Sequence, residues 1–146
     1  MKKRILHIFF MIWCVPIFSQ EVLTKKSPVS FEETLKVVES TLKSNNFTIF
    51  AKIDQADAAK KAGLSMNPGV VFIFGNPKAG TSLMQENPVW VLDLPLKVAV
   101  YQDSNNIAYV STFDMKKIAK RNKLSKTQMP KIQAMVDFLE KLLTIR

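Results

Sequence analysis

No segment limits the fold more than the continuous apolar run from Val70 to Phe74, which follows the turn pair Pro68-Gly69. β-Branched and aromatic residues fill this run, and no polar residue interrupts it. A short run of this kind predicts a central strand that is buried on both faces of its sheet. The chain is therefore expected to fold around a β-sheet.

The segments before this run predict a helix and then a strand. Ser30 and Glu33 have the spacing of a capping box, which predicts a helix that ends at Asn45-Asn46. Alternation from Phe47 to Ile53 then predicts a strand. Its two expected faces are Phe47, Ile49, Ala51 and Ile53 on one side and Thr48, Phe50 and Lys52 on the other.

The remaining elements follow from caps, turns and prolines. Asp54 is expected to cap a short helix over 55–62 that ends at Gly63. After the apolar run we expect a loop over 75–80, a helical turn from Thr81 to Pro88, strand-like segments over 89–92 and 96–101 around Pro95, a turn over 103–106, a strand over 107–113 that completes a hairpin, and a helix over 131–143.

This order predicts an α+β fold: a single layer of mostly antiparallel sheet, with four or five strands, helices packed on one face, and a C-terminal helical extension. The last helix carries an apolar stripe made by Ile132, Val136, Leu139 and Leu143. The stripe must dock either on the chain's own sheet or on a second subunit, so a homodimer is one of two alternatives.

The N-terminal segment has the three parts of a secretory signal. Lys2-Lys3-Arg4 is basic, the run from Ile5 to Phe18 is mostly apolar, and Ser19 is a small residue at its exit. We expect cleavage near Ser19 and a periplasmic or secreted protein. An uncleaved amphipathic or anchor helix is the alternative.

Cleavage would leave a chain without cysteine or histidine, because Cys14 and His7 both lie in the predicted signal. Disulfides, Cys or His metal sites, haem ligation and Ser-His-Asp or Cys-His nucleophiles are then excluded. We expect no cofactor, no metal site and no catalytic residue.

The charge divides the chain into two parts. Residues 20–114 hold nine basic and ten acidic residues, whereas residues 115–146 hold nine basic and two acidic residues. We therefore expect a domain over 20–114 and a basic helical extension over 115–146. The extension could make a peripheral contact with an anionic membrane, or it could be a solvated helix face. Nucleic acid is not an expected partner.

The densest motif is the glycine-containing segment from Gly75 to Thr81. It is not a phosphate-binding P-loop, because Thr81 stands where that motif needs a lysine. Its backbone N–H groups could still hold a small anion with Lys78 and Thr81, or the segment could be a rigid turn. With a second cluster at Asp93 and Lys97, the candidate ligand contacts are Gly75, Asn76, Pro77, Lys78, Gly80, Thr81, Asp93 and Lys97.

The chain resembles the DUF 302 family, a bacterial and archaeal domain of unknown function. The resemblance covers about Ser30 to Phe113. It rests on Ser30-Phe31-Glu32-Glu33-Thr34, the segment from Ile53 to Gly63, Phe74-Gly75-Asn76-Pro77-Lys78-Ala79-Gly80-Thr81 and Leu92-Asp93-Leu94-Pro95-Leu96-Lys97-Val98. It implies an α+β fold with a largely antiparallel sheet, and no established activity. Similar sequences end the last strand with Tyr-Asn-Asp-Pro. In this chain only the aspartate of that motif has a counterpart, which is Asp114.

Three functions follow from these patterns. The first is an exported, non-enzymatic domain that binds a small ligand or a protein partner through the candidate contacts. The second is an enzyme with Asp54 or Asp93 as base and Lys78 or Lys97 as electrophilic partner. The third is a structural envelope protein that docks through residues 115–146.

Overall fold

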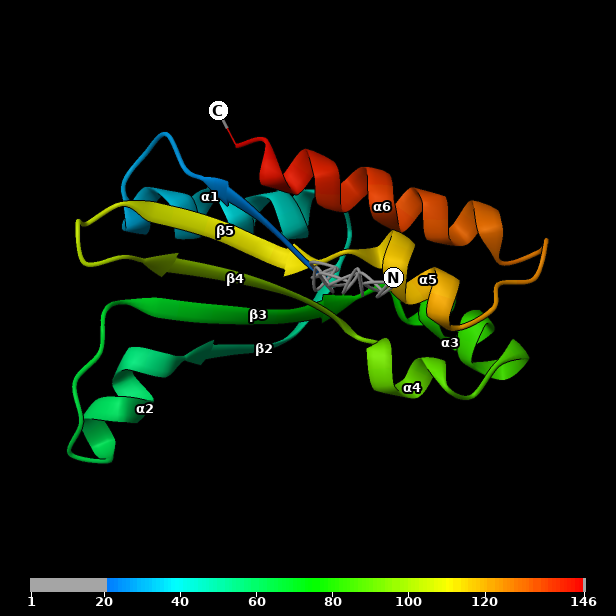
Figure 1. Cartoon of the computed structure of the whole chain (residues 1–146), viewed down its shortest axis with the longest axis horizontal. Helices are drawn as coiled ribbons and strands as arrows, with labels where there is room; N and C mark the ends of the chain where they lie inside the picture. The colour runs from blue at the N-terminus through cyan, green and yellow to red at the C-terminus, as the bar shows by residue number, and fades with distance from the viewer. Residues whose placement is uncertain (1–20, 146) are drawn as a thin grey trace, which may run out of the picture.

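A computed structural model describes residues 21–145 and contains one five-stranded sheet (Figure 1). The strands follow the order β1-β5-β4-β3-β2, and every neighbouring pair is antiparallel. The elements are β1 (Val22–Lys26), α1 (Phe31–Ser44), β2 (Thr48–Asp54), α2 (Gln55–Lys61), β3 (Gly69–Gly75), α3 (Pro77–Glu86), α4 (Trp90–Asp93), β4 (Leu96–Gln102), β5 (Ala108–Phe113), α5 (Met115–Arg121) and α6 (Met129–Leu143). The expected α+β fold is confirmed. The predicted signal over 1–19 lies outside the described residues.

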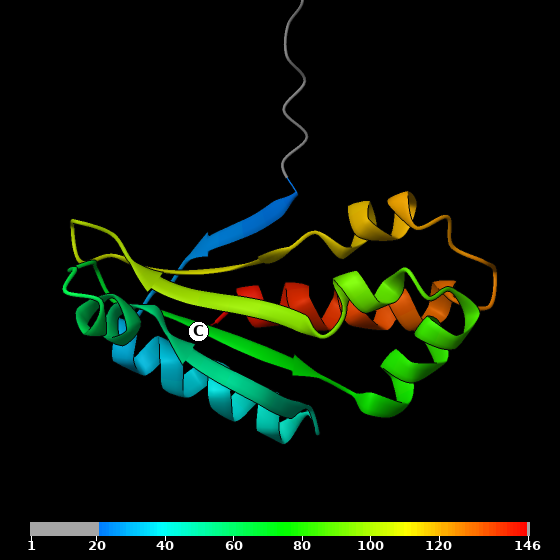
Figure 2. The same ribbon diagram turned by 90° about the horizontal axis from the view of Figure 1, so that it is seen from below.

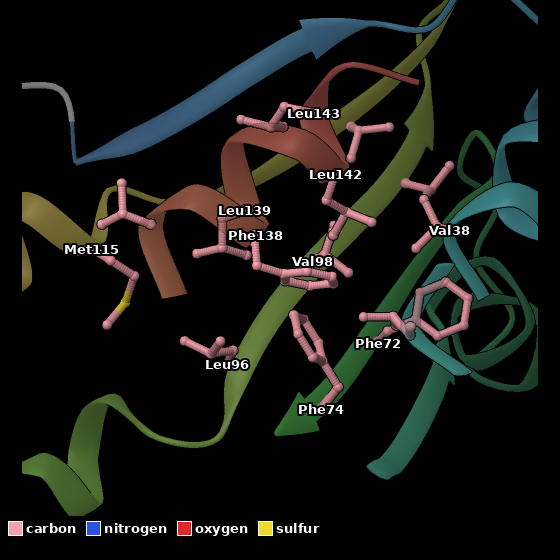
Figure 3. Close-up of a cluster of buried hydrophobic side chains, with 14 of the residues drawn as sticks. Val38, Phe72, Phe74, Leu96, Val98, Met115, Phe138, Leu139, Leu142 and Leu143 are labelled. Carbon is pink, nitrogen blue, oxygen red and sulfur yellow. The ribbon is translucent and has the colours of Figure 1, made fainter. Parts of the chain in front are cut away.

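The two long helices α1 and α6 lie on the same side of the sheet, as Figures 1 and 2 show. Between these helices and the sheet lies a single apolar core, part of which is drawn in Figure 3. Phe138 of α6 packs at its centre, where its ring centroid lies 4.3 Å from that of Phe47 and 6.1 Å from that of Phe74. Among the described helices, none is both long enough and apolar enough to cross a membrane.

β3 is an interior strand, as the apolar run predicts, but it is not buried on both faces. Phe72 and Phe74 are fully buried beneath the helices. Val71 and Ile73 point to the opposite face and are only half-buried. The reason is that α1 and α6 both pack on one face of the sheet. Among the described elements, no long helix packs on the other face of β3, so Val71 and Ile73 stay partly accessible to solvent.

A β-bulge changes the expected faces of β2. The register with β3 shifts between Ile49 and Ala51, so that Ile49 pairs with Phe74 whereas Lys52 pairs with Phe72. Lys52 therefore comes to the helix side, where its ammonium group lies 5.3 Å from the centre of the Phe72 ring. The prediction that Ile49 and Ile53 share one face is wrong, because an inserted residue reverses the alternation.

Several local predictions are confirmed. The backbone N–H of Glu33 donates to Ser30 Oγ over 3.3 Å, and the backbone N–H of Ser30 donates to the Glu33 carboxylate over 3.2 Å. Asp54 caps α2, and Gly63 follows that helix with a φ of +76°. In the β4–β5 turn, Asp103 Oδ1 accepts from the backbone N–H of Ile107 over 2.9 Å.

The expected loop over 75–80 is wrong, because α3 already begins at Pro77. The Asn76 side chain accepts from the backbone N–H of Lys78 over 3.1 Å and from that of Ala79 over 3.3 Å. An N-cap asparagine followed by proline at the first helical position is a strong helix start. Thr81 is therefore an interior residue of α3 and not its cap.

The expected strand over 89–92 is also wrong, because Trp90 to Asp93 form the short helix α4. Trp90 is fully buried, which fixes this turn against the domain. Asn87 Oδ1 accepts from the backbone N–H of Val89 over 3.2 Å and favours the turn locally. Tertiary burial of one large side chain thus overrides the strand propensity of Val-Trp-Val.

The C-terminal helices belong to the same core as the sheet. The apolar stripe of α6 is buried against the chain's own sheet and not left for a second subunit. The residues that α5 and α6 bury are Met115, Ile118, Ala119, Ile132, Val136, Phe138, Leu139, Leu142 and Leu143. Residues 115–143 are therefore a structural part of the domain. β1, which was not predicted, pairs with β5 from Val22 opposite Phe113 to Lys26 opposite Tyr109.

Candidate functional site

A pocket of about 620 Å³ opens at one end of the sheet, where β3 ends and β2 and β4 begin. Helix α3 forms one wall and α6 forms another. Its volume lies within the range of about 300–1,000 Å³ that is typical of small-ligand sites. The lining residues are Phe47, Phe50, Gly75, Asn76, Pro77, Ala79, Gly80, Thr81, Met84, Leu94, Pro95, Leu96, Lys131, Ala134 and Met135.

The surface of this pocket is mainly apolar. Phe47 forms its boundary with the core, because the ring also packs edge-on against Phe74 at a centroid distance of 5.3 Å. Met84 of α3 and Met135 of α6 contribute flexible thioether side chains. Methionine adapts its shape to irregular apolar partners, so this wall suits an apolar ligand.

The bulge in β2 supplies one edge of the pocket. Phe50 stands at the bulge and remains largely exposed, with its ring close to Gly75 at the end of β3. A Cβ atom on Gly75 would lie 3.3 Å from Phe50 Cε2, which is a tight contact. Gly75 therefore leaves room for the Phe50 ring at the pocket edge.

A polar network joins α3 to the start of α6 beside the pocket. The Glu86 carboxylate accepts from Thr127 Oγ1 over 2.9 Å, from Lys131 Nζ over 3.2 Å and from Ser125 Oγ over 3.2 Å. The hydrogen bond from Thr127, followed by that from Lys131, lowers the pKa of Glu86 below its usual range. Lys131 is the one charged residue of the pocket lining, and Glu86 holds its ammonium group.

The structure brings most of the sequence-predicted residues together. Gly75, Asn76, Pro77, Gly80 and Thr81 all line the pocket. Three further candidates, Lys78, Asp93 and Lys97, are not part of its lining.

The helix N-terminus beside the pocket is already capped. Asn76 Oδ1 accepts the N–H groups of Lys78 and Ala79, and Gly80 donates its N–H to Asn76 O over 2.9 Å. Pro77 has no N–H to offer. The hypothesis that these backbone groups hold a small anion together with Lys78 and Thr81 therefore loses its donors.

Asp93 and Lys97 do not form a pair. The Asp93 carboxylate is nearly buried, is bound by the Arg121 guanidinium, and accepts from Asn122 Nδ2 over 2.6 Å. Lys97 lies exposed on β4, opposite Ile73. Asp93 thus connects α4 to the end of α5.

The second pair of predicted acids lies away from the pocket. Asp54 caps α2 at the far end of β2, and Asp57 pairs with Lys61 at 2.6 Å. Within residues 21–145, no three His, Cys, Asp or Glu side chains gather in a group that could hold a metal ion.

The pocket residues that sequence reasoning missed come from separate elements. Phe47 immediately precedes β2, Phe50 lies within β2, Met84 belongs to α3, and Ala134 and Met135 belong to α6. Phe50 stands on the polar side of an alternating strand, and this was the one local signal that it faces something other than the core. The α6 residues carry no such signal, because only the packing of that helix brings them to the pocket.

Comparison with known proteins extends the earlier resemblance. The family model described as "Domain of unknown function DUF302" matches residues 23–142, which includes β1, α5 and nearly all of α6. The match is thus wider than the motifs over 30–113. A crystal structure of an uncharacterized conserved DUF302 protein from Bacillus stearothermophilus superposes with a TM-score of 0.74 at 19% identity, over 86% of this chain and 97% of that one.

Three curated relatives bear the name of an ion channel. Fluoride-specific ion channel FluC 1 of Brucella suis biovar 1 (strain 1330) is 33% identical over 120 residues, which are 82% of this chain and 47% of that protein. FluC 1 of Brucella abortus biovar 1 (strain 9-941) has the same identity over 120 residues and is covered to 44%. The chain therefore spans less than half the length of these relatives.

Proposed function

Because this chain belongs to the DUF302 family, whose description gives no activity, we propose its function from its own pocket: the domain binds a small apolar ligand and catalyses no reaction. The observation that carries the proposal is the mainly apolar pocket of about 620 Å³ between α3 and α6. Five of the residues singled out from the sequence line it, and none of them bears a charge.

The lining indicates the chemistry of the ligand. Aromatic, methionine and proline side chains favour an aliphatic or aromatic body. Asn76 uses its side-chain oxygen to cap α3, and Lys131 is paired with Glu86. A ligand with many polar groups would therefore leave those groups without partners, at a high cost in free energy.

The alternative of a carboxylate–lysine enzyme finds less support. Asp93 is engaged by Arg121 and Asn122, and Asp54 caps a helix at the opposite end of β2 from the pocket. General acid–base work needs an acid or base within hydrogen-bond reach of a bound substrate. Neither of these carboxylates is part of the pocket lining.

Binding of an uncharged fluorophore, N-phenyl-1-naphthylamine, tests the proposal. We expect saturable enhancement of its fluorescence by the wild-type protein. Ala134→Trp places an indole on the α6 wall and should weaken binding by roughly tenfold or more, because the filled pocket cannot expand cheaply. Gln133→Trp is the matched control, since Gln133 is the preceding residue of α6, is exposed and lies outside the lining.

Two results would overturn this function. One is the absence of saturable enhancement with the wild-type protein. The other is an equal loss of binding in Ala134→Trp and Gln133→Trp while both variants keep the thermal midpoint of the wild type.

Export is a separate part of the proposal and rests on the signal-like pattern of residues 1–19. N-terminal sequencing of the protein recovered from its own cells tests it. A first residue close to Gln20 supports cleavage and export, whereas an intact Met1 or Lys2 contradicts cleavage.

The curated relatives favour a second candidate function, in which the domain serves a membrane channel. In proteins named as fluoride channels, a segment like this chain makes up just under half of the sequence. We do not extend channel activity to this chain, because the match leaves the rest of those proteins unaccounted for. Fluoride efflux from vesicles that contain such a channel, measured with and without this protein, tests the candidate. An unchanged efflux rate would remove it.

A further inference from the structure

Helix α4 and the residue that precedes it, Val89, present three apolar side chains to solvent. Val89 is 53% exposed, Val91 is 62% exposed and Leu92 is 80% exposed. We call Val89, Val91 and Leu92 the apolar α4 patch. Single exposed apolar residues are common on protein surfaces, whereas apolar side chains that gather into a contiguous exposed patch are typical of interaction sites.

This patch is held in place from beneath. Trp90, between two of its members, is fully buried. Asp93, which ends α4, binds Arg121 and Asn122, and Asn87 Nδ2 donates to the carbonyl oxygen of Asn122 over 3.2 Å. The exposure of the apolar α4 patch is therefore built into the packing of α4 against the end of α5.

The segment that holds the patch is strongly basic. Between Met115 and Lys126 the sequence has six basic residues and no acidic residue. Within residues 21–145, Lys120, Lys123 and Lys126 form no ion pair. Figures 1 and 2 place α4 and α5 next to each other at the same end of the molecule.

We propose that this end of the molecule docks on an anionic lipid bilayer. Val91 and Leu92 enter the headgroup region, and the lysines of the α5 segment contact lipid phosphates. Neither signal is strong alone, because each basic residue near a membrane adds only modestly and a few apolar side chains bury little area. Together they provide the two signals that stable peripheral binding needs.

None of the residues of the apolar α4 patch lines the ligand pocket. The proposed membrane surface also differs from the expectation that the extension over 115–146 makes the contact by itself. The apolar stripe of α6 is buried in the core, so α6 cannot offer that stripe to a membrane. The membrane-facing elements are instead α4 and the basic segment from Met115 to Lys126.

Position-specific quenching tests the depth of insertion. Leu92→Trp is mixed with phosphatidylglycerol–phosphatidylcholine vesicles whose acyl chains carry bromine, and wild-type emission is subtracted. We expect strong quenching of the added indole. Leu64→Trp is the matched control, because Leu64 is 68% exposed but follows α2 at the other end of the sheet, and its indole should stay unquenched.

Charge reversal tests the electrostatic part. Lys120→Glu/Lys126→Glu should weaken sedimentation with the same vesicles by roughly tenfold or more, and raising the salt should reduce wild-type binding. Lys36→Glu/Lys60→Glu changes the net charge equally on α1 and α2 and should have a much smaller effect.

Equal quenching at positions 92 and 64 would overturn the proposal. So would equal losses in the two charge variants, or equal binding to vesicles of pure phosphatidylcholine. Binding of the apolar α4 patch to a protein partner would leave Leu92→Trp unquenched by lipid and would therefore also contradict it.

Discussion

Gly63 and Gly80 have different roles, although each lies in or beside a helix. Gly80 is an interior residue of α3, and a Cβ atom there would come no closer than 3.7 Å to Leu94 Cδ1. Gly63 follows α2 with a φ of +76°, where a Cβ atom would meet nothing within 4 Å but the backbone itself disfavours one. At Gly80, the space around the Cβ position determines whether a larger residue is tolerated. At Gly63, the backbone conformation determines it.

Gly80→Ala should therefore stabilise the protein. Alanine favours a helix interior over glycine by roughly 1 kcal/mol, so we expect an increase of about 0.5–1 kcal/mol in the free energy of unfolding. Gly63→Ala should lower it by about 1 kcal/mol, because the left-handed conformation strains any residue with a Cβ. Urea unfolding of both variants measures the two changes. A destabilised Gly80→Ala protein would mean that the α3 wall of the pocket has less room than the contact distances indicate.

At the scale of elements, Glu39 connects α1 to the edge strand β2. Its carboxylate lies 2.6 Å from Lys43 Nζ on the same helix and 2.8 Å from Lys52 Nζ on β2. The β2 bulge turns Lys52 to this side, so the ion pair depends on the irregular register. Hydrogen bonds from Lys43 and then Lys52 lower the pKa of Glu39 from 4.5 to about 2.

The stabilising effect of Glu39 should depend on pH. A lowered pKa in the folded state stabilises the protein above pH 4.5, and this stabilisation is lost as the pH falls towards 2. Exposed ion pairs contribute at most about 1 kcal/mol, so the effect is small. At about pH 6–7, the thermal midpoint of Glu39→Gln should lie below that of the wild type. The difference between the two midpoints should disappear as the pH falls towards 2. A gap that stays constant down to the lowest pH would contradict the role of the carboxylate charge.

At the scale of the whole molecule, the C-terminal helices complete the core. Phe138, Leu139 and Leu142 of α6 pack against the sheet (Figure 3). Fully burying one large apolar side chain contributes about 1.5–3 kcal/mol, and whole domains are stable by only about 5–15 kcal/mol. The segment over 20–114 is thus not expected to be stable by itself.

Truncation after Asp114 should abolish cooperative unfolding, because it removes nine buried residues of α5 and α6. Thermal unfolding followed by near-ultraviolet circular dichroism measures the loss. Truncation after Leu143 is the control and should keep a cooperative transition. A cooperative transition in the shorter protein would show that residues 115–143 are dispensable for folding.

Most of the regular elements could be predicted from short stretches of sequence. The capping box of Ser30 and Glu33, the Asp54 cap and the Asp103 turn each join residues within a few positions. Their hydrogen bonds join near neighbours along the chain and need no distant residue, so the local pattern predicts them. The start of α3 could also have been predicted, because Asn76 followed by Pro77 is a helix-start signal. The two nearby glycines led instead to the prediction of a loop.

The pocket and the surface that we propose to face a membrane could be predicted only in part. Most of the α3 wall lies within residues 75–81, whereas the α6 wall comes from residues at least fifty positions later in the chain. The bond of Asp93 to Arg121 and Asn122, the pairing of β1 with β5 and the orientation of Phe50 likewise depend on distant residues.

The amino-acid pattern alone thus determines the α+β class, the antiparallel hairpin and the amphipathic helices, since these depend on local hydrogen bonds and on the spacing of apolar residues. The tertiary structure decides which faces meet. Burial of Trp90 favours a helix in a segment whose residues are typical of a strand. Packing of α6 against the sheet supplies the second wall of the pocket. Both outcomes depend on the apolar surface that the whole chain removes from water, and no single segment contains that information.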